Sequence, residues 1–143
     1  MRIFKGYATV REVSGMMIPV TTQHQIMRSY CEKNRAIYKL AQLEIVSKNS
    51  SLILISLLKD LSYKGNLIMC SVNMLPQSLR TRKYIYRIIL QKKLNIHFVY
   101  ESFIISNLET IKNIELFFNL VDEIDENNLA LTKLKIKNFE ILS

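Results

Sequence analysis

Short β-rich runs alternate with amphipathic helical runs along most of this chain. Four runs rich in β-branched and aromatic residues predict strands: Ile3–Val10, Ala36–Val46, Leu67–Val72 and Asn95–Tyr100. Apolar residues recurring at helical spacing predict four helices: Thr22 to about Asn34, a second with the buried stripe Leu54, Leu57, Leu58 and Leu61, then Gln77–Lys93 and Asn107–Val121.

Two local signals suggest where helices begin. Thr22 and Gln25 have the spacing of a capping box, which predicts the start of the first helix. Pro76 predicts the start of the third, because the N–H that proline lacks would be unpaired there anyway.

Alternation of strands and helices at this spacing predicts right-handed βαβ units. We therefore expect an α/β fold with a mostly parallel four- to five-stranded sheet flanked by helices. Residues 1–128 would form one domain, and the basic segment 129–143 would pack on that domain or on a second subunit. Apolar residues beyond what one small helix can bury, among them Phe117, Phe118 and Leu120, favour a homodimer.

Composition limits the class of protein and of partner. A net charge of +8 favours acidic partners such as nucleic acid or anionic sugars. The chain is, however, rich in Lys, Ile and Asn throughout, and such a composition gives a positive charge even in a protein that binds no acidic partner. Cys31 and Cys70 lie among apolar residues, which predicts buried, reduced thiols. We find no secretory signal and no apolar run long enough to span a membrane, so we expect a cytoplasmic protein.

Candidate site residues follow from the rule that parallel sheets bind ligands beyond the carboxyl ends of their strands. Polar residues after the predicted strands, together with one histidine at a helix start, form the predicted substrate-binding set: Arg11, Glu12, Ser14, His24, Glu44, Ser71, Asn73 and Glu101. The Arg11 guanidinium suits a phosphate or carboxylate.

Other chemistries are weaker. Glu12, Glu44 and Glu101 could hold a hard cation or act as acid and base. For Glu12 and Glu44, salt bridges with Arg11 or Arg28 are the simpler interpretation. His97, in mid-strand, is expected in the core. The histidines and cysteines lack zinc spacing, and no Gly-rich phosphate loop is present. We therefore expect neither a metal nor a cofactor.

Several segments resemble the catalytic domain of serine recombinases, the resolvases and invertases. Lys5–Val10 looks like their first strand, Leu67–Ser78 like their third strand and the loop after it, and Ile96–Glu101 like their fourth. In that family the nucleophilic serine follows Gly-Tyr-Ala-Arg-Val, whereas here Arg11 holds that position. At the place of the family's Asp-Arg-Leu-x-Arg motif, residues 73–77 read Asn-Met-Leu-Pro-Gln, which lacks the aspartate and both arginines. The resemblance therefore implies a resolvase-like fold without strand cleavage.

The sequence is also similar to the sporadic carbohydrate cluster family, found among bacterial surface-polysaccharide genes. The segments that carry this similarity are the Gly-Tyr strand, Ile18–Val20, Tyr30–Asn34, Glu44, Ser71 with Leu75–Pro76, and the strand ending near Glu101. It implies a role in making or regulating a surface glycan such as O-antigen or capsule. Together with Arg11 at the predicted strand end, this role suggests an anionic sugar or sugar-phosphate ligand.

Two functions remain open at this stage. The first is a non-recombinase α/β protein of surface-carbohydrate biosynthesis that binds an anionic sugar at the strand ends. The second is a degenerate recombinase-like domain that binds DNA or a protein without catalysis. We rank nucleic acid below the sugar as partner, and Arg80–Lys93 is the helix that would contact it. The residues do not decide whether the protein is an enzyme.

Overall fold

The structure, a computed structural model, describes residues 1–10, 17–44 and 51–120. Its strands are β1 (Ile3–Thr9), β2 (Ile37–Glu44), β3 (Asn66–Met69), β4 (Asn95–Phe98) and β5 (Phe103–Ile105). Its helices are α1 (Val20–Lys33), α2 (Leu52–Asp60), the 3-10 turn η1 (Val72–Met74) and α3 (Leu79–Lys92), and residues 108–120 are also helical.

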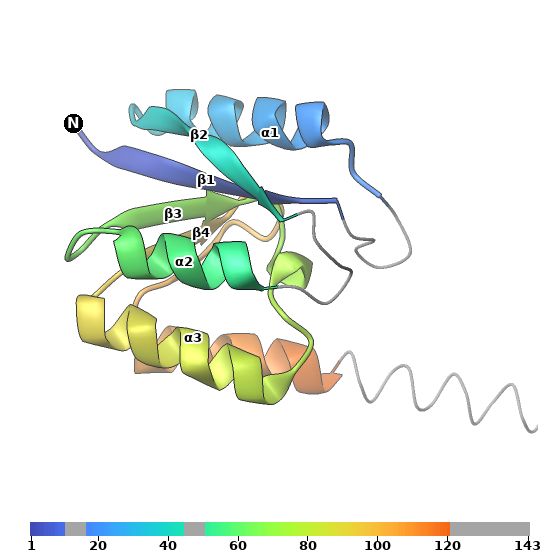
Figure 1. Cartoon of the computed structure of the whole chain (residues 1–143), viewed down its shortest axis with the longest axis vertical. Coiled ribbons are helices and arrows are strands. Elements are labelled where there is room, and N and C mark those ends of the chain that lie inside the picture. Colours follow the sequence, from blue (N-terminus) through green and yellow to red (C-terminus); the bar gives the residue numbers. More distant parts are fainter. Residues whose placement is uncertain (11–16, 45–50, 121–143) are drawn as a thin grey trace, which may run out of the picture.

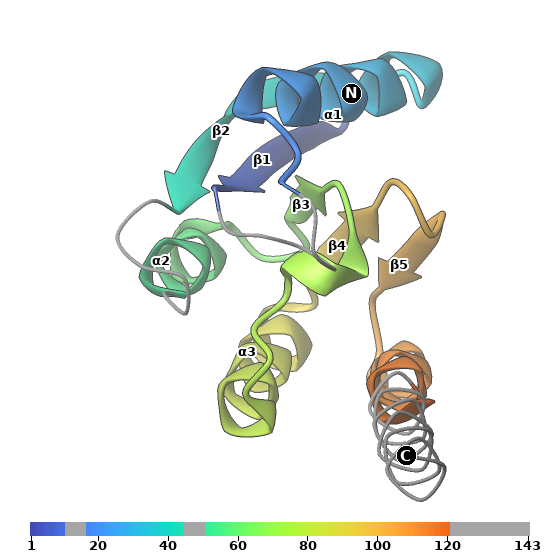
Figure 2. The same cartoon turned by 90° about the vertical axis from the view of Figure 1, so that its right-hand side faces the viewer.

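The described strands form one five-stranded sheet in the order β2-β1-β3-β4-β5. All neighbours are parallel except β5, which runs antiparallel to β4. Helix α1 covers one face of the sheet, and α2, α3 and helix 108–120 lie on the other (Figures 1 and 2). This arrangement confirms the predicted α/β fold with a mostly parallel sheet flanked by helices.

The core fills both sides of the central strands. Strand β3 is buried from Leu67 to Met69, as expected for a parallel strand covered by helices on both faces. Phe4 and Tyr7 of β1 are also fully buried, and so are Leu54 and Leu58 of α2. Burial of such apolar side chains is the main source of stability for a domain of this size.

Two predicted helix starts are wrong. Helix α1 begins at Val20 after Pro19 and has no side-chain cap, so Thr22 lies inside the helix and forms no capping box. Helix α3 begins at Leu79, where the Ser78 hydroxyl accepts a hydrogen bond from the Thr81 N–H at 3.3 Å. Pro76 thus starts no helix: it lies in the connection between η1, which ends at Met74, and α3.

Strand β5 was not assigned from the sequence. The chain reverses after β4 through Ser102, which has a φ of 50°, and β5 then pairs along β4. Helix 108–120 begins after Asn107, whose Oδ1 accepts from the Thr110 N–H at 2.9 Å. Phe117 and Leu120 are exposed on this helix. The predicted homodimer and the segment 129–143, which lies outside the described residues, remain predictions.

Candidate functional site

The carboxyl ends of β1 to β4 meet at one edge of the sheet, which we call the carboxyl edge. Three of the predicted site residues lie there: Glu44 ends β2, Ser71 follows β3 and Glu101 follows β4. Arg11, Glu12 and Ser14 lie outside the described residues. Asn73 sits in η1 beside Ser71, with a half-buried side chain. The sheet topology therefore brings together half of the predicted set.

Glu44 holds the start of α2. Its buried carboxylate accepts hydrogen bonds from the backbone N–H groups of Ile53, at 3.0 Å, and Leu54, at 3.1 Å. It also accepts one from the Tyr7 hydroxyl at 3.3 Å. A carboxylate at a helix N-terminus satisfies free N–H donors and the positive end of the helix dipole. The described contacts of Glu44 thus include a structural role that the sequence did not predict.

Ser71 and Glu101 form a tight pair. The Ser71 hydroxyl donates to Glu101 Oε1 at 2.6 Å, and the Val72 N–H donates to the same oxygen at 2.7 Å. The Ser71 oxygen in turn accepts from the Asn73 N–H at 3.2 Å, which stabilises η1. Such short bonds are typical of a carboxylate acceptor. Ser71 is buried, so this pair fixes the loop after β3 against the turn after β4.

The other oxygen of Glu101 differs from the first. Oε2 is buried and accepts no hydrogen bond from the described residues. A buried polar atom without a partner costs about 1–3 kcal/mol, so a donor at this point would stabilise the native state. Glu101 Oε2, like the buried Ser51 Oγ directly before α2, therefore points to a ligand or to an ordered water.

The thiol of Cys70 lies directly before this pair. Its Sγ donates to the Gln23 carbonyl at 3.6 Å, and burial, followed by the charge of Glu101, raises the pKa of the thiol to about 12. Burial also raises the pKa of the Cys31 thiol to about 11. Both cysteines are core residues, as predicted, and neither is a thiolate nucleophile at neutral pH.

The two histidines occupy different positions in the fold. His24 lies near the start of α1, next to Gln23, whose side chain bonds Thr9 at the end of β1 and whose carbonyl accepts from Cys70 after β3. Its Nδ1 is 2.8 Å from the Tyr38 hydroxyl of β2. His97 is buried, as predicted, and burial, with a smaller contribution from Arg2, lowers the pKa of its imidazole to about 4. His24 thus lies near the carboxyl edge, where its imidazole contacts β2 through Tyr38.

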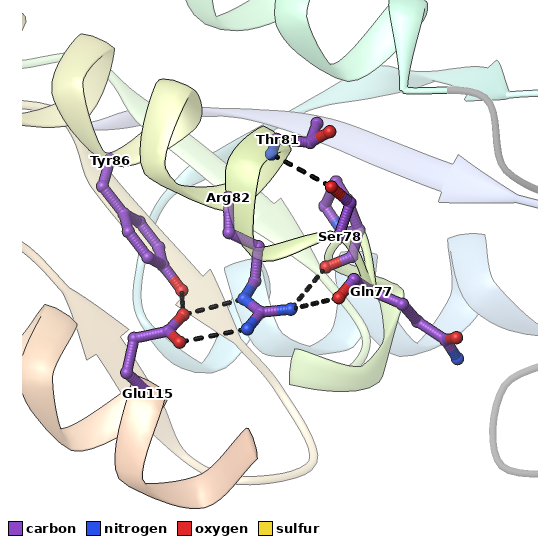
Figure 3. Close-up of polar contacts among 7 residues, drawn as sticks. Gln77, Ser78, Thr81, Arg82, Tyr86 and Glu115 are labelled. Carbon is purple, nitrogen blue, oxygen red and sulfur yellow. Dashed lines mark hydrogen bonds and ion pairs between the residues drawn. The ribbon is translucent and has the colours of Figure 1, made fainter. Parts of the chain in front are cut away.

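A polar cluster that the sequence did not predict lies between α3 and helix 108–120 (Figure 3). Arg82 donates to both carboxylate oxygens of Glu115, at 2.7 and 3.0 Å, and to the carbonyls of Pro76 and Gln77. The Tyr86 hydroxyl donates to Glu115 Oε1 at 2.5 Å. We call Arg82, Tyr86 and Glu115 the helix clamp.

Electrostatics favour the charged state of the clamp. Burial alone would raise the pKa of Glu115, but hydrogen bonds from Arg82 and Tyr86 outweigh it and the pKa is lowered. Burial would lower the pKa of Arg82, but the hydrogen bond and charge of Glu115 outweigh it and the pKa is raised. Because all three Arg82 nitrogens and the Tyr86 hydroxyl donate to neighbours in the protein, we interpret the clamp as structural.

The polar side chains at the described part of the carboxyl edge are largely covered: Glu44 and Ser71 are buried and hydrogen-bonded within the protein. The described residues contain no group of three or more metal-ligating side chains. No helix among the described residues is long and apolar enough to cross a membrane.

Comparisons with known proteins support the fold only. No protein-family model matches the chain, and no curated protein matches it. A similar solved structure is the crystal structure of the N-terminal catalytic domain of TP901-1 integrase, with a TM-score of 0.55 and 16% sequence identity. The alignment covers 89% of this chain and 98% of that one. The resolvase-like α/β fold expected from the sequence is thus confirmed.

Proposed function

We propose, with the resolvase-like fold as the premise, that this protein binds an anionic sugar at its carboxyl edge and does not cleave DNA. The observation that carries the proposal is the buried Glu101 Oε2, which accepts no hydrogen bond from the described residues. A sugar hydroxyl is a donor that would satisfy it. Because the atom is covered, the ligand would have to displace its cover, and binding would then be coupled to a local rearrangement.

The charge of the ligand is inferred from the sequence. Arg11 follows Val10 directly, and Val10 is bonded at the carboxyl edge through its N–H to the Glu44 carbonyl at 3.4 Å. A guanidinium there would bind a phosphate or carboxylate through paired donors. The same residue replaces the attacking serine of the resembled recombinases, which is why we propose binding without strand cleavage.

The biological setting follows from the sequence resemblance alone. Similarity to the sporadic carbohydrate cluster family supports a role in bacterial surface-carbohydrate biosynthesis, such as that of O-antigen or capsule, in the cytoplasm.

A thermal-shift screen against sugar phosphates and nucleotide sugars tests the proposal. A ligand at one hundred times its Kd stabilises the native state by about 2.7 kcal/mol, which raises the Tm by about 8 °C. We expect Arg11→Ala and Glu101→Gln to abolish this shift and the exposed control Lys112→Ala to keep it. No shift with any of these ligands, or an equal shift in Arg11→Ala, would refute the proposed site.

The alternative, binding of DNA or of a protein without catalysis, is favoured by one observation. Arg80, Lys83 and Arg87 are exposed at helical spacing along α3 and form a basic face. If this face contacts three phosphates, replacing all three residues should reduce the salt slope of duplex DNA binding by about 3. Salt-independent or undetectable DNA binding would leave only a protein partner for this face.

A further inference from the structure

A cavity of about 420 Å³ lies at the other end of the sheet, the amino edge, where the strands begin. It lies on the face covered by α2, next to the starts of β1 and β2. Helix α2 runs back from the carboxyl edge and has nine residues, ending at Asp60. The chain then turns into β3 at the same end of the molecule as the N-terminus (Figure 1). The lining includes Ile3, Lys5, Lys39, Leu57, Asp60 and Ser62.

Two lysines stand side by side in this cavity. Lys5 of β1 and Lys39 of β2 are direct partners in the parallel ladder, and both line the cavity. Neighbouring strands lie about 4.8 Å apart, and like charges placed opposite each other destabilise a sheet. A lysine on an edge strand guards against aggregation, which would account for Lys39. It does not account for Lys5, which lies on a strand paired on both sides.

Neither lysine is neutralised within the described part of the chain. The ion pair found there joins Arg82 and Glu115, and no described carboxylate lies within 4.0 Å of the Lys5 or Lys39 ammonium group. The carbonyls at the end of α2 are not free acceptors either, because the Lys92 ammonium group donates to Leu58, at 3.0 Å, and to Lys59. Asp60 also lines the cavity, but its carboxylate forms no ion pair with either lysine among the described residues.

We propose that this cavity binds the phosphate group of a small phosphomonoester through Lys5 and Lys39. A phosphate dianion can be shared by two ammonium groups, and lysine binds phosphate as a point charge. The buried Leu57 and the half-exposed Ile3 give the cavity an apolar wall for the organic part of the ligand, and Ser62 supplies a hydroxyl. The cavity volume falls within the range of small-molecule sites, about 300–1,000 Å³.

This site is separate from the carboxyl edge. Lys5 is four residues, or about 13 Å, from Thr9 at the end of β1. The face of β1 that carries Lys5 is also opposite to that of Phe4, which packs against Tyr30 of α1. Binding in this cavity should therefore not depend on Arg11 or Glu101.

Calorimetric titration of the full chain with glucose 6-phosphate and AMP tests the proposal, with glucose and adenosine as the phosphate-free controls. The variant Lys5→Met/Lys39→Met keeps unbranched side chains that are one atom shorter and removes their charge. The matched control Lys33→Met/Lys112→Met removes two exposed charges elsewhere. We expect at least a tenfold loss of affinity in the first variant and no change in the second, with Arg11→Ala retaining this binding.

Thermal melts of the same variants test whether a loss of affinity arises from a loss of folded protein. Because the substitutions relieve a like-charge contact, Lys5→Met/Lys39→Met should melt no lower than the wild type. The proposal is overturned if neither phosphate ester binds at millimolar concentration, if glucose or adenosine binds equally well, or if both double variants lose affinity to the same extent. Loss of binding in Arg11→Ala alone would also overturn it, and would assign the phosphate to the carboxyl edge instead.

Discussion

Acid should destabilise this protein through His97, and the size of the effect can be worked from its surroundings. The imidazole is buried, it stacks on Phe4 at 4.3 Å, and both ring nitrogens have partners at 3.1 Å: Nδ1 the Tyr30 hydroxyl and Nε2 the Asn66 Oδ1. Burial first, and the charge of Arg2 second, lower the pKa from 6.5 to about 4. The native state therefore holds His97 neutral.

The sign follows from which state binds the proton. Between pH 6.5 and about 4 the unfolded chain is protonated at this histidine and the native chain is not, so stability falls as pH falls through that window. At 1.36 kcal/mol per pKa unit, the loss is about 3 kcal/mol by pH 4. Above pH 6.5 the contribution is complete and constant.

Urea unfolding at about pH 7.5 and about pH 4 measures the loss, and His97→Gln provides the control. Glutamine keeps a polar side chain and removes the titration, so all other acid effects are shared by the two proteins. We expect the free energy of unfolding to fall by about 3 kcal/mol more in the wild type than in the variant. An equal fall in both proteins, or an imidazole NMR titration for His97 centred near pH 6.5, would refute this account.

Two further predictions concern buried polar groups. Glu115→Ala should lower the free energy of unfolding by about 3 kcal/mol, because it leaves the buried Arg82 guanidinium without its counter-charge. The control Lys112→Ala on the same helix should change the free energy of unfolding by less than about 0.5 kcal/mol. Equal losses of stability in denaturant melts of the two variants would argue against the clamp. Cys31 and Cys70 should react with a thiol reagent only as fast as the protein opens, because burial raises their pKa values to about 11 and 12. Rapid labelling of either thiol in the native protein would contradict their placement.

Local patterns in the sequence were sufficient to predict the four parallel strands and the presence of the long helices, although not β5 or every helix start. The apolar run from Leu67 identified the central strand, and the Leu54, Leu57 and Leu58 spacing identified the buried side of α2. The rule of strand ends then placed Glu44, Ser71 and Glu101 at one edge. These predictions succeed because they depend on periodicity and chain order, which a sequence contains directly.

Features that depend on distant pairs could not be predicted in this way. Arg82 and Glu115 are 33 residues apart, and on pattern alone Arg82 is one more charge of a basic helix. The Lys5–Lys39 pairing requires the register of β1 against β2, which shifts between Lys5 and Tyr7. Strand β5 follows a turn in which Ser102 has a positive φ. Glycine is the residue that usually marks such a position in a sequence, and the serine gives no such signal.

The helix clamp gives helix 108–120 a fixed angular setting. Apolar side chains pack in many orientations, but a guanidinium fork meets a carboxylate only when both are aligned. One extra or missing residue between β5 and Glu115 would rotate that carboxylate by about 100° around the helix axis, away from Arg82. The clamp therefore sets the rotation of helix 108–120 about its own axis relative to α3, and it makes the number of residues between the helix start and Glu115 a structural requirement.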